Sequence, residues 1–300
     1  MSKRKAPKRD LPGEWARSNP SPARPGFDRA VTAQSRSAWN GVLEDIYNKK
    51  ARLDVRENEE WWYRGHPAQY TLRPSLFRLL DSGFNKKEND SRSIFDLEYD
   101  LFFEFASRGP GLQDAGLSSW DMLAYMRHHG LPTRLLDWTE SLGIALFFAI
   151  HDADPSASTE PELWILNPYG LNEIELGDRD LYSPRYLGYD VKNDQEWDYE
   201  DYLIWDAGTF DWEHPVAIYP PQKNARMRSQ HGWFTIFGED LQALEIQVPE
   251  VVSRVQIPRL ALPAAQQFLR DAGIDWAAAF PDLDGFVRSV KDRYSIPGPR

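Results

Sequence analysis

The apolar run from Leu142 to Ile150 constrains the fold of this chain more than any other segment. Its nine residues, LGIALFFAI, contain no charged side chain. A surface helix keeps one polar face, so a helix expected over residues 140–151 has to be buried on most sides. The run is much shorter than the roughly 20 apolar residues that cross a bilayer. The chain must therefore build a core around this helix.

Hydrophobic periodicity predicts more helices before this run and more strands after it. The expected helices cover residues 37–48, 94–107, 119–129, 264–272 and 282–294. The expected strands cover residues 61–63, 133–138, 162–166, 216–219, 233–237, 244–248 and 252–257. Gly65 and Pro67 are expected to stop the first strand. Because no regular strand–helix–strand alternation is present, the pattern favours an α+β fold.

The first 30 residues differ from the rest of the chain. They carry eight Lys or Arg against three acidic residues, together with five prolines. Such a segment buries too little apolar surface to offset its ordering entropy, which predicts a basic disordered tail. It is either a solvated terminus or an electrostatic arm for a nucleic acid or an acidic partner. Residues 31–300 are predicted to form one domain.

An acidic, aromatic insertion is predicted at residues 190–213. It holds nine acidic residues against Lys192, with five Trp or Tyr side chains among them. One interpretation is a lid or a docking surface for a basic partner, with the aromatic rings as anchors. The other is a solvated loop whose aromatic side chains pack back on the body. The composition favours neither.

Composition excludes several classes of protein. The chain has no cysteine, which excludes disulfide scaffolds, cysteine nucleophiles and Cys-ligated zinc or iron–sulfur sites. A net charge of −11 argues against broad coating of nucleic acid. His128 and His129 are adjacent, so on a helix they point about 100° apart and do not chelate one ion. We expect no metal site, no membrane contact and a cytoplasmic location, because no signal peptide is visible.

Polar residues gather in three segments beside apolar runs. In the first, Arg64 follows an aromatic strand and precedes Gly65, so that a guanidinium fork and bare backbone amides can face an anionic or amide-bearing ligand. The alternative is that Arg64 pairs with a core carboxylate such as Asp137. The second segment runs from His128 to Thr139, and the third runs from Pro221 to Phe234.

The third segment is basic in an acidic protein. Lys223, Arg226 and Arg228 lie between two expected strands, which suggests a pocket for phosphate or pyrophosphate. In the second segment, His128 and His129 also fit simple charge compensation at a helix C-terminus.

Three ordered motifs in these segments resemble the FRG domain, a bacterial and phage-encoded family named for its Phe/Tyr-Arg-Gly motif. They are Tyr63-Arg64-Gly65, the stretch from His129 to Thr139 (HGLPTRLLDWT), and the stretch from Gln230 to Phe234 (QHGWF). The resemblance covers roughly residues 35–290.

The Tyr-Arg-Gly strand is in turn similar to the first motif of the Arg-Ser-Glu class of ADP-ribosyltransferases. That likeness implies an ADP-ribosyltransferase-like mixed sheet with flanking helices and NAD as substrate. On this basis Arg64 supports the NAD phosphates, Gly65 holds the nicotinamide amide, and Thr133 or Thr139 takes the place of the hydroxyl motif. The expected NAD-binding set is Arg64, Gly65, Thr133, Arg134, Arg226 and Arg228.

The resemblance departs from the pattern at the catalytic Glu. No Glu occupies residues 230–233. Gln230 is expected to hold the ribose hydroxyls instead, and His129, Asp137 or His231 to act as the base. The expected activity is transfer of ADP-ribose to a protein or nucleic-acid acceptor by a toxin or phage-defence effector.

Two other functions compete with the transferase. One is a non-catalytic sensor of a nucleotide or phage component that docks a partner on residues 190–213. The other is a metal-independent nuclease that uses His129, His231 and the arginines. Binding of NAD with nicotinamide release, binding without release, and shortening of RNA or DNA distinguish the three.

Overall fold

The computed structural model of the chain describes residues 31–83, 93–109, 111, 116–151, 153, 158–187, 189–190, 195–205, 210, 212–219, 232–294 and 296. The helices are α2 (Ala33–Lys50), α3 (Ser75–Asp81), α4 (Ile94–Arg108), α5 (Ser119–His128), α6 (Leu142–Ile150), α7 (Pro168–Leu176), α8 (Pro184–Leu187), α9 (Tyr199–Trp205), α11 (Leu244–Gln247), α12 (Leu262–Asp271), α13 (Trp276–Ala279) and α14 (Leu283–Arg293), with 3₁₀ turns η3 (Pro249–Val251) and η4 (Arg259–Ala261). The strands are β1 (Trp62–His66), β2 (Leu135–Thr139), β3 (Glu162–Leu166), β4 (Tyr189–Asp190), β5 (Gln195–Glu196), β6 (Val216–Ile218), β7 (Gly232–Ile236) and β8 (Val252–Gln256).

A six-stranded sheet with the order β6-β7-β2-β1-β3-β8 forms the centre of the described fold. Every neighbouring pair in it is antiparallel, and helices flank it, which confirms the α+β class. β1 and β2 pair only through Tyr63 and Thr139, whereas β1 and β3 pair along five residues. The sheet therefore splays between β1 and β2 into two halves, β1-β3-β8 and β2-β7-β6.

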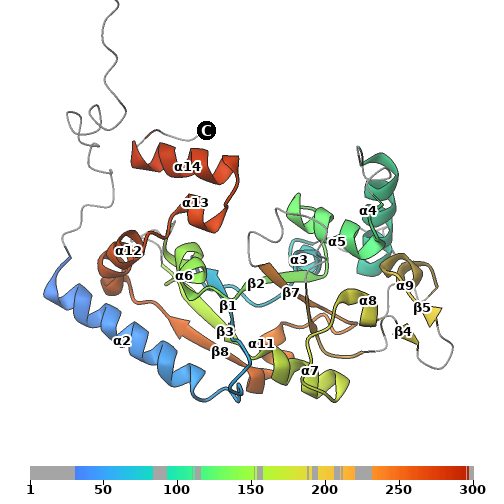
Figure 1. Ribbon diagram of the computed structural model, residues 1–300, viewed down its shortest axis with the longest axis horizontal. Coiled ribbons are helices and arrows are strands. Elements are labelled where there is room, and N and C mark those ends of the chain that lie inside the picture. Colours follow the sequence, from blue (N-terminus) through green and yellow to red (C-terminus); the bar gives the residue numbers. More distant parts are fainter. Residues whose placement is uncertain are drawn as a thin grey trace, which may run out of the picture.

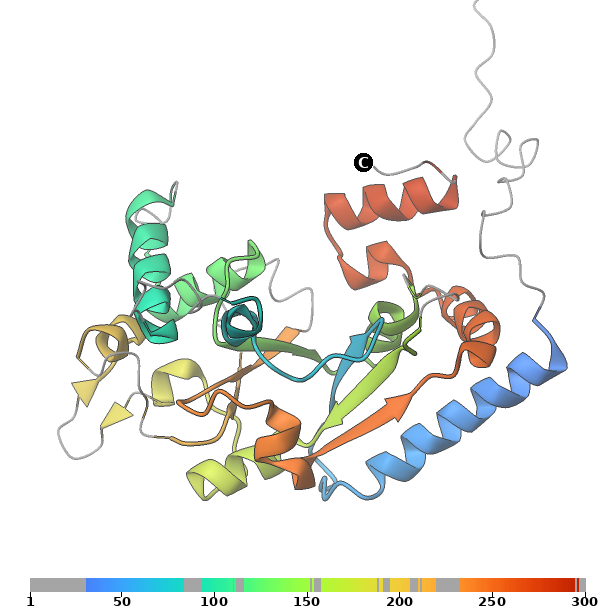
Figure 2. The same cartoon turned by 180° about the vertical axis from the view of Figure 1, so that it is seen from behind.

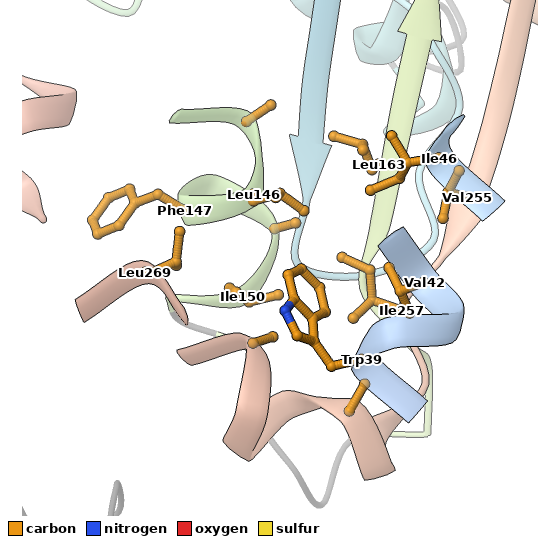
Figure 3. Close-up of a cluster of buried hydrophobic side chains, with 14 of the residues drawn as sticks. Trp39, Val42, Ile46, Leu146, Phe147, Ile150, Leu163, Val255, Ile257 and Leu269 are labelled. Carbon is orange, nitrogen blue, oxygen red and sulfur yellow. The ribbon is translucent and has the colours of Figure 1, made fainter. Parts of the chain in front are cut away.

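The first core packs α2, α6 and α12 against β1, β3 and β8. Figure 3 shows Trp39, Val42 and Ile46 of α2 facing side chains from α6 and from the sheet. The buried position predicted for α6 is confirmed, since most of its side chains are inaccessible. A Cβ atom on Gly65 would lie 1.8 Å from the carbonyl oxygen of Ala145, so the α6 backbone rests directly on β1.

Two further cores complete the body. A second core lies on the opposite face of the sheet and contains Trp62, Leu136 and Trp164. A third core packs α4, α5 and α9 against β2, β7 and β6. Side chains alternate along a strand, and Tyr63 pairs with Thr139, so the third core shares the face of the first. Figures 1 and 2 show the corresponding helix groups, α2 with α12–α14 and α4 with α5 and α9, on either side of β1 and β2.

Two strand predictions were wrong in detail. Residues 244–247 form helix α11 rather than a strand, because Leu244 and Val248 are buried four residues apart while Ile246 is 58% exposed. β1 does not stop at Gly65 but continues to His66. Glycine there adopts extended backbone, and its missing side chain makes room for α6.

Three aromatic side chains of the insertion predicted at residues 190–213 pack on the body. Tyr199, Tyr202 and Trp212 are buried in the third core, whereas Trp205 is 72% exposed. This confirms the packed interpretation for those three rings. The basic tail at residues 1–30 lies outside the described residues, and within the described part of the chain no helix has both the length and the apolar character to cross a membrane.

Candidate functional site

A cleft of about 1270 Å³ opens where the sheet splays. Arg64 on β1 and Asp137 on β2 lie at its floor. The C-terminal end of α5 and part of α6 line its sides, together with Phe280, which follows α13, and Arg288 of α14. The cleft is thus bordered by the helices of the first core and of the third core.

Arg64 bridges the two diverging strands. Its Nη1 donates to the backbone oxygen of Asp137 at 2.7 Å and lies 3.5 Å from the Oδ2 of the same residue. Its Nε donates to Nε2 of His66 at 2.9 Å. The guanidinium therefore joins the strands where their backbone pairing has ended. The predicted alternative, that Arg64 pairs with Asp137, is confirmed, and the same side chain also lines the cleft.

Arg127 of α5 makes the closest contacts with Asp137. Its Nε donates to both carboxylate oxygens at 3.1 and 3.0 Å, Nη2 donates to Oδ2, and Nη1 reaches the hydroxyl of Ser75 at 3.2 Å. Burial opposes ionisation of Asp137, but the guanidinium of Arg127 outweighs it and lowers the pKa of the carboxyl. Asp137 is therefore ionised and engaged by two arginines, which makes it an anchor and a weak proton acceptor.

The floor carries an excess of positive charge. Arg78 of α3 is exposed, lines the cleft, and donates from Nη1 to the backbone oxygen of Arg73 at 2.5 Å. Burial and the proximity of Arg127 lower the pKa of Arg78. Burial lowers the pKa of Arg64 to about 10, so it stays protonated at neutral pH. Three guanidinium groups, those of Arg64, Arg78 and Arg127, face the single carboxylate of Asp137.

His66 adds no charge to this floor. Burial and the neighbouring Arg64 lower its pKa to about 3, so the imidazole is neutral and accepts from Arg64. The excess of two positive charges is therefore not altered by His66 at neutral pH. Such a group of cations suits a dianion better than a neutral ligand.

The sides of the cleft are partly aromatic. Phe148 of α6 and Phe280 line it, and their ring centroids lie 5.5 Å apart in an edge-to-face arrangement. Phe234 of β7 lines it from the other half of the sheet. Aromatic faces of this kind stack with the planar rings of nucleotides.

Some predicted site residues lie at this cleft. Arg64, Gly65, His129 and Asp137 line it. His129 is exposed at the end of α5, where Gly130 adopts a left-handed conformation with φ of 84°. Gln230, His231, Arg226 and Arg228 lie outside the described residues.

Two other predicted residues lie elsewhere. Thr133 and Arg134 are fully buried and are not among the residues that line the cleft. The backbone of Thr133 joins Ser75 and Leu76 of α3. Arg134 forms a bidentate ion pair with Glu98 of α4, whose carboxylate also accepts from the hydroxyl of Tyr199 at 2.5 Å. These contacts explain why both residues face the protein interior instead of a ligand.

Sequence reasoning assigned no role to Arg78, Arg127 or His66. A signal for Arg127 was present, because it lies three and four residues after Ala124 and Leu123, on the stripe of α5 that is otherwise buried. A charged residue on a buried stripe needs a partner. Among the described residues no three His, Asp or Glu side chains gather as a metal site would require.

Comparison with known proteins identifies part of this region. Residues 59–158 match the family model of the FRG domain. The matched segment contains β1, β2 and helices α3 to α6, and so the whole arginine floor, whereas β3, β6, β7 and β8 lie beyond it. No curated protein and no solved structure matches the chain.

Proposed function

We propose that the cleft whose arginine floor lies in the segment matched by the FRG domain binds NAD as the donor for ADP-ribosyl transfer to a protein or nucleic-acid acceptor. The observation that carries the proposal is the floor formed by Arg64, Arg78 and Arg127 around Asp137. The excess of two positive charges at this floor matches the two negative charges of a dinucleotide pyrophosphate, and Asp282, Asp284 and Arg288, which also line the cleft, together add one negative charge.

The size and lining of the cleft support the same ligand. Small-molecule pockets usually measure about 300–1,000 Å³. A cleft of about 1270 Å³ is large enough for a dinucleotide. With the pyrophosphate over the arginines, Phe148 and Phe280 offer ring faces to nicotinamide or adenine.

The chemical step makes a further demand on the site. In the proposed transfer the bond between ribose and nicotinamide breaks, its electron pair leaves with nicotinamide, and the acceptor's nucleophile bonds to the ribose carbon and loses a proton to a base. A positively charged ribose needs an electronegative group beside it. Asp137 is already engaged by Arg127 and Arg64, so His129 at the rim and the predicted Gln230 and His231 are the candidates for orienting the ribose and taking the proton.

A second candidate function rests on that same engagement of Asp137. A protein that binds NAD or a related nucleotide without turnover needs the arginine floor and no free carboxylate. We therefore regard nucleotide sensing as the alternative that the described residues support.

Binding and turnover are tested separately. We expect NAD to bind the wild-type protein in isothermal titration calorimetry and Arg78→Gln to weaken binding by about tenfold, because one charge-assisted contact is lost. Arg78 is an exposed residue that lines the cleft, so we expect this variant to keep the fold. Arg52→Gln, an exposed change on the segment after α2, is the matched control and should bind NAD like the wild type.

The assay for turnover is nicotinamide release in the presence of cell lysate as a source of acceptors, with Arg64→Ala beside the wild type. Release that needs Arg64 supports the transferase. Binding without release favours the sensor. Absence of NAD binding by the folded wild-type protein contradicts both.

A further inference from the structure

Helix α14 presents its apolar side to solvent. Leu283, Phe286 and Val287 are 75%, 58% and 40% exposed, and Val290 is half-buried. Residues three, four and seven positions apart share one side of a helix, so these four side chains form an apolar stripe. None of the four belongs to the three cores of the described part of the chain. A contiguous exposed stripe of this kind marks an interaction surface.

The side of α14 that contacts the body carries small residues instead. Its buried residues are Gly285 and Ser289. A Cβ atom on Gly285 would lie 1.9 Å from the carbonyl oxygen of Phe280, and the hydroxyl of Ser289 donates to Oδ2 of Asp275 at 2.5 Å. Figures 1 and 2 show α14 at the outer end of its helix group, with α13 between it and α6. This attachment leaves the apolar stripe uncovered by the described residues.

A helix as short as α14 gains little stability from such an attachment. It has 11 residues, and isolated helices shorter than about 12–15 residues are only marginally stable in water. Burial of a glycine and a serine contributes little hydrophobic stabilisation. A partner that covers the stripe would supply the missing apolar burial.

The spacing of the stripe fits another helix as that partner. Leu283, Val287, Val290 and Tyr294 follow one another at intervals of four, three and four residues. Apolar residues at alternating intervals of three and four form the seam along which two helices pack side by side.

The charges of α14 fit a second copy of the same helix. Its first turn carries Asp284 and its last turn carries Lys291 and Arg293. Asp284 and Lys291 lie seven residues apart, and so on the same flank of the stripe. In an antiparallel pair related by a two-fold axis, Asp284 of each copy lies beside Lys291 of the other. Parallel pairing would instead place like charges together.

We propose that α14 pairs in antiparallel orientation with α14 of a second copy of this chain, and that the apolar stripe is the centre of a homodimer interface. One helix from each copy gives an interface at the small end of the specific range, so the dimer should dissociate reversibly on dilution. This proposal does not depend on NAD binding in the cleft.

Sedimentation equilibrium of the full chain, from low to high micromolar concentration, tests the apolar stripe. We expect the wild type to show a reversible monomer–dimer equilibrium. Val287→Asp buries an unpaired charge in the middle of the interface and should weaken dimerisation by at least about tenfold. Ile246→Asp is the matched control, because it alters another apolar side chain, 58% exposed on α11, and should dimerise like the wild type.

Charge reversal tests the antiparallel orientation. Asp284→Lys alone or Lys291→Glu alone brings like charges together and should weaken dimerisation several-fold. The double variant should recover it, and an equimolar mixture of the two single variants should form a heterodimer. A loss of helix stability would give another pattern, because both reversals oppose the macrodipole and would make the double variant the weakest.

A wild-type protein that stays monomeric at every concentration overturns the proposal, and so does a dimer that Val287→Asp leaves unchanged. A double variant no stronger than the single variants contradicts the antiparallel orientation. Monomeric protein that sediments with vesicles of anionic phospholipid would assign the stripe to a lipid surface instead. Circular dichroism checks the fold of each variant, and should Val287→Asp fail to fold, the charge variants carry the test.

Val287 is not among the residues that line the cleft. NAD binding should therefore be equal in Val287→Asp and the wild type, so failure of this proposal and failure of the NAD proposal give different results.

Discussion

Two arginine–carboxylate sites include residues three positions apart, Arg134 directly before β2 and Asp137 within it, and the two sites differ in their access to water. At the closed site, Arg134 and Glu98 have side chains 0% and 1% exposed, and Tyr199 completes the group. At the open site, Arg127 and Asp137 have side chains 19% and 39% exposed. The closed site balances one cation with one anion, whereas the open site gathers three guanidinium groups around one carboxylate.

This difference separates a structural ion pair from a binding site. The closed site links β2 to α4 and α9 and has no surface left for a ligand. The open site links β2 to β1 and α5 and still presents excess positive charge to a large cleft. An arginine–carboxylate pair thus serves two purposes in this protein, because the surroundings of the two pairs differ.

The largest effect expected from this comparison is on stability at the closed site. Glu98→Gln leaves the charge of Arg134 buried without its counter-ion, which should reduce the free energy of unfolding by about 3–5 kcal/mol. Urea denaturation followed by circular dichroism measures it. Glu104→Gln on the same helix breaks an exposed pair with Arg108 and should change stability by less than about 1 kcal/mol. Similar losses in both variants would mean that the closed site contributes no more than a surface pair.

A smaller loss of stability is expected from a substitution at Gly65, which tests the packing of α6 on β1 separately from the neighbouring ion pair. In Gly65→Ala the new Cβ meets the Ala145 carbonyl of α6, and the overpacking should cost about 1–3 kcal/mol. Gly41→Ala is the control, because nothing lies within 4 Å of a Cβ there and alanine favours the helix. If Gly65→Ala proved as stable as the wild type, then the close approach of α6 would not be what requires glycine at this position.

Sequence patterns were sufficient for most elements of the fold. The apolar run predicted the burial of α6, and periodicity located α4, α5 and the strands that pair with β2 and β3. It failed at α11, because a four-residue helix with a single buried residue, Leu244, is too short to show a period that differs from that of a strand. The divergence of β1 from β2 could not be predicted from the sequence, since it depends on long-range pairing that no local pattern encodes.

The site was only partly predictable for a related reason. Arg64 and Asp137 could be paired because each interrupts an apolar segment, and the structure joins them. Arg134 has the same sequence appearance, but its partner Glu98 lies 36 residues away, on a helix whose position no motif indicates. Arg78 and Arg127 enter the site through the packing of α3 and α5, which only the fold defines.

The smallest expected effect on stability is at the open site, and it depends on pH. The pKa of Asp137 is lowered in the folded protein, so its stabilising contribution is present above the pKa of an unfolded Asp, about 3.9, and is lost as the pH falls through the lower folded value. Asp137→Asn should therefore reduce the free energy of unfolding by about 1–2 kcal/mol at pH 7, because a partly hydrated pair contributes less than a buried one. The difference from the wild type should shrink as the pH falls through the lowered pKa of Asp137, because the protonated carboxyl group is then uncharged like the amide. Asp45→Asn, which removes a weak 3.9 Å pair with Lys49, should show little difference at either pH. Urea titrations at pH 7, 4 and 2 measure these differences, and a gap between wild type and Asp137→Asn that stays constant with pH would mean that the carboxylate acts through shape alone and not through its charge among the three arginines.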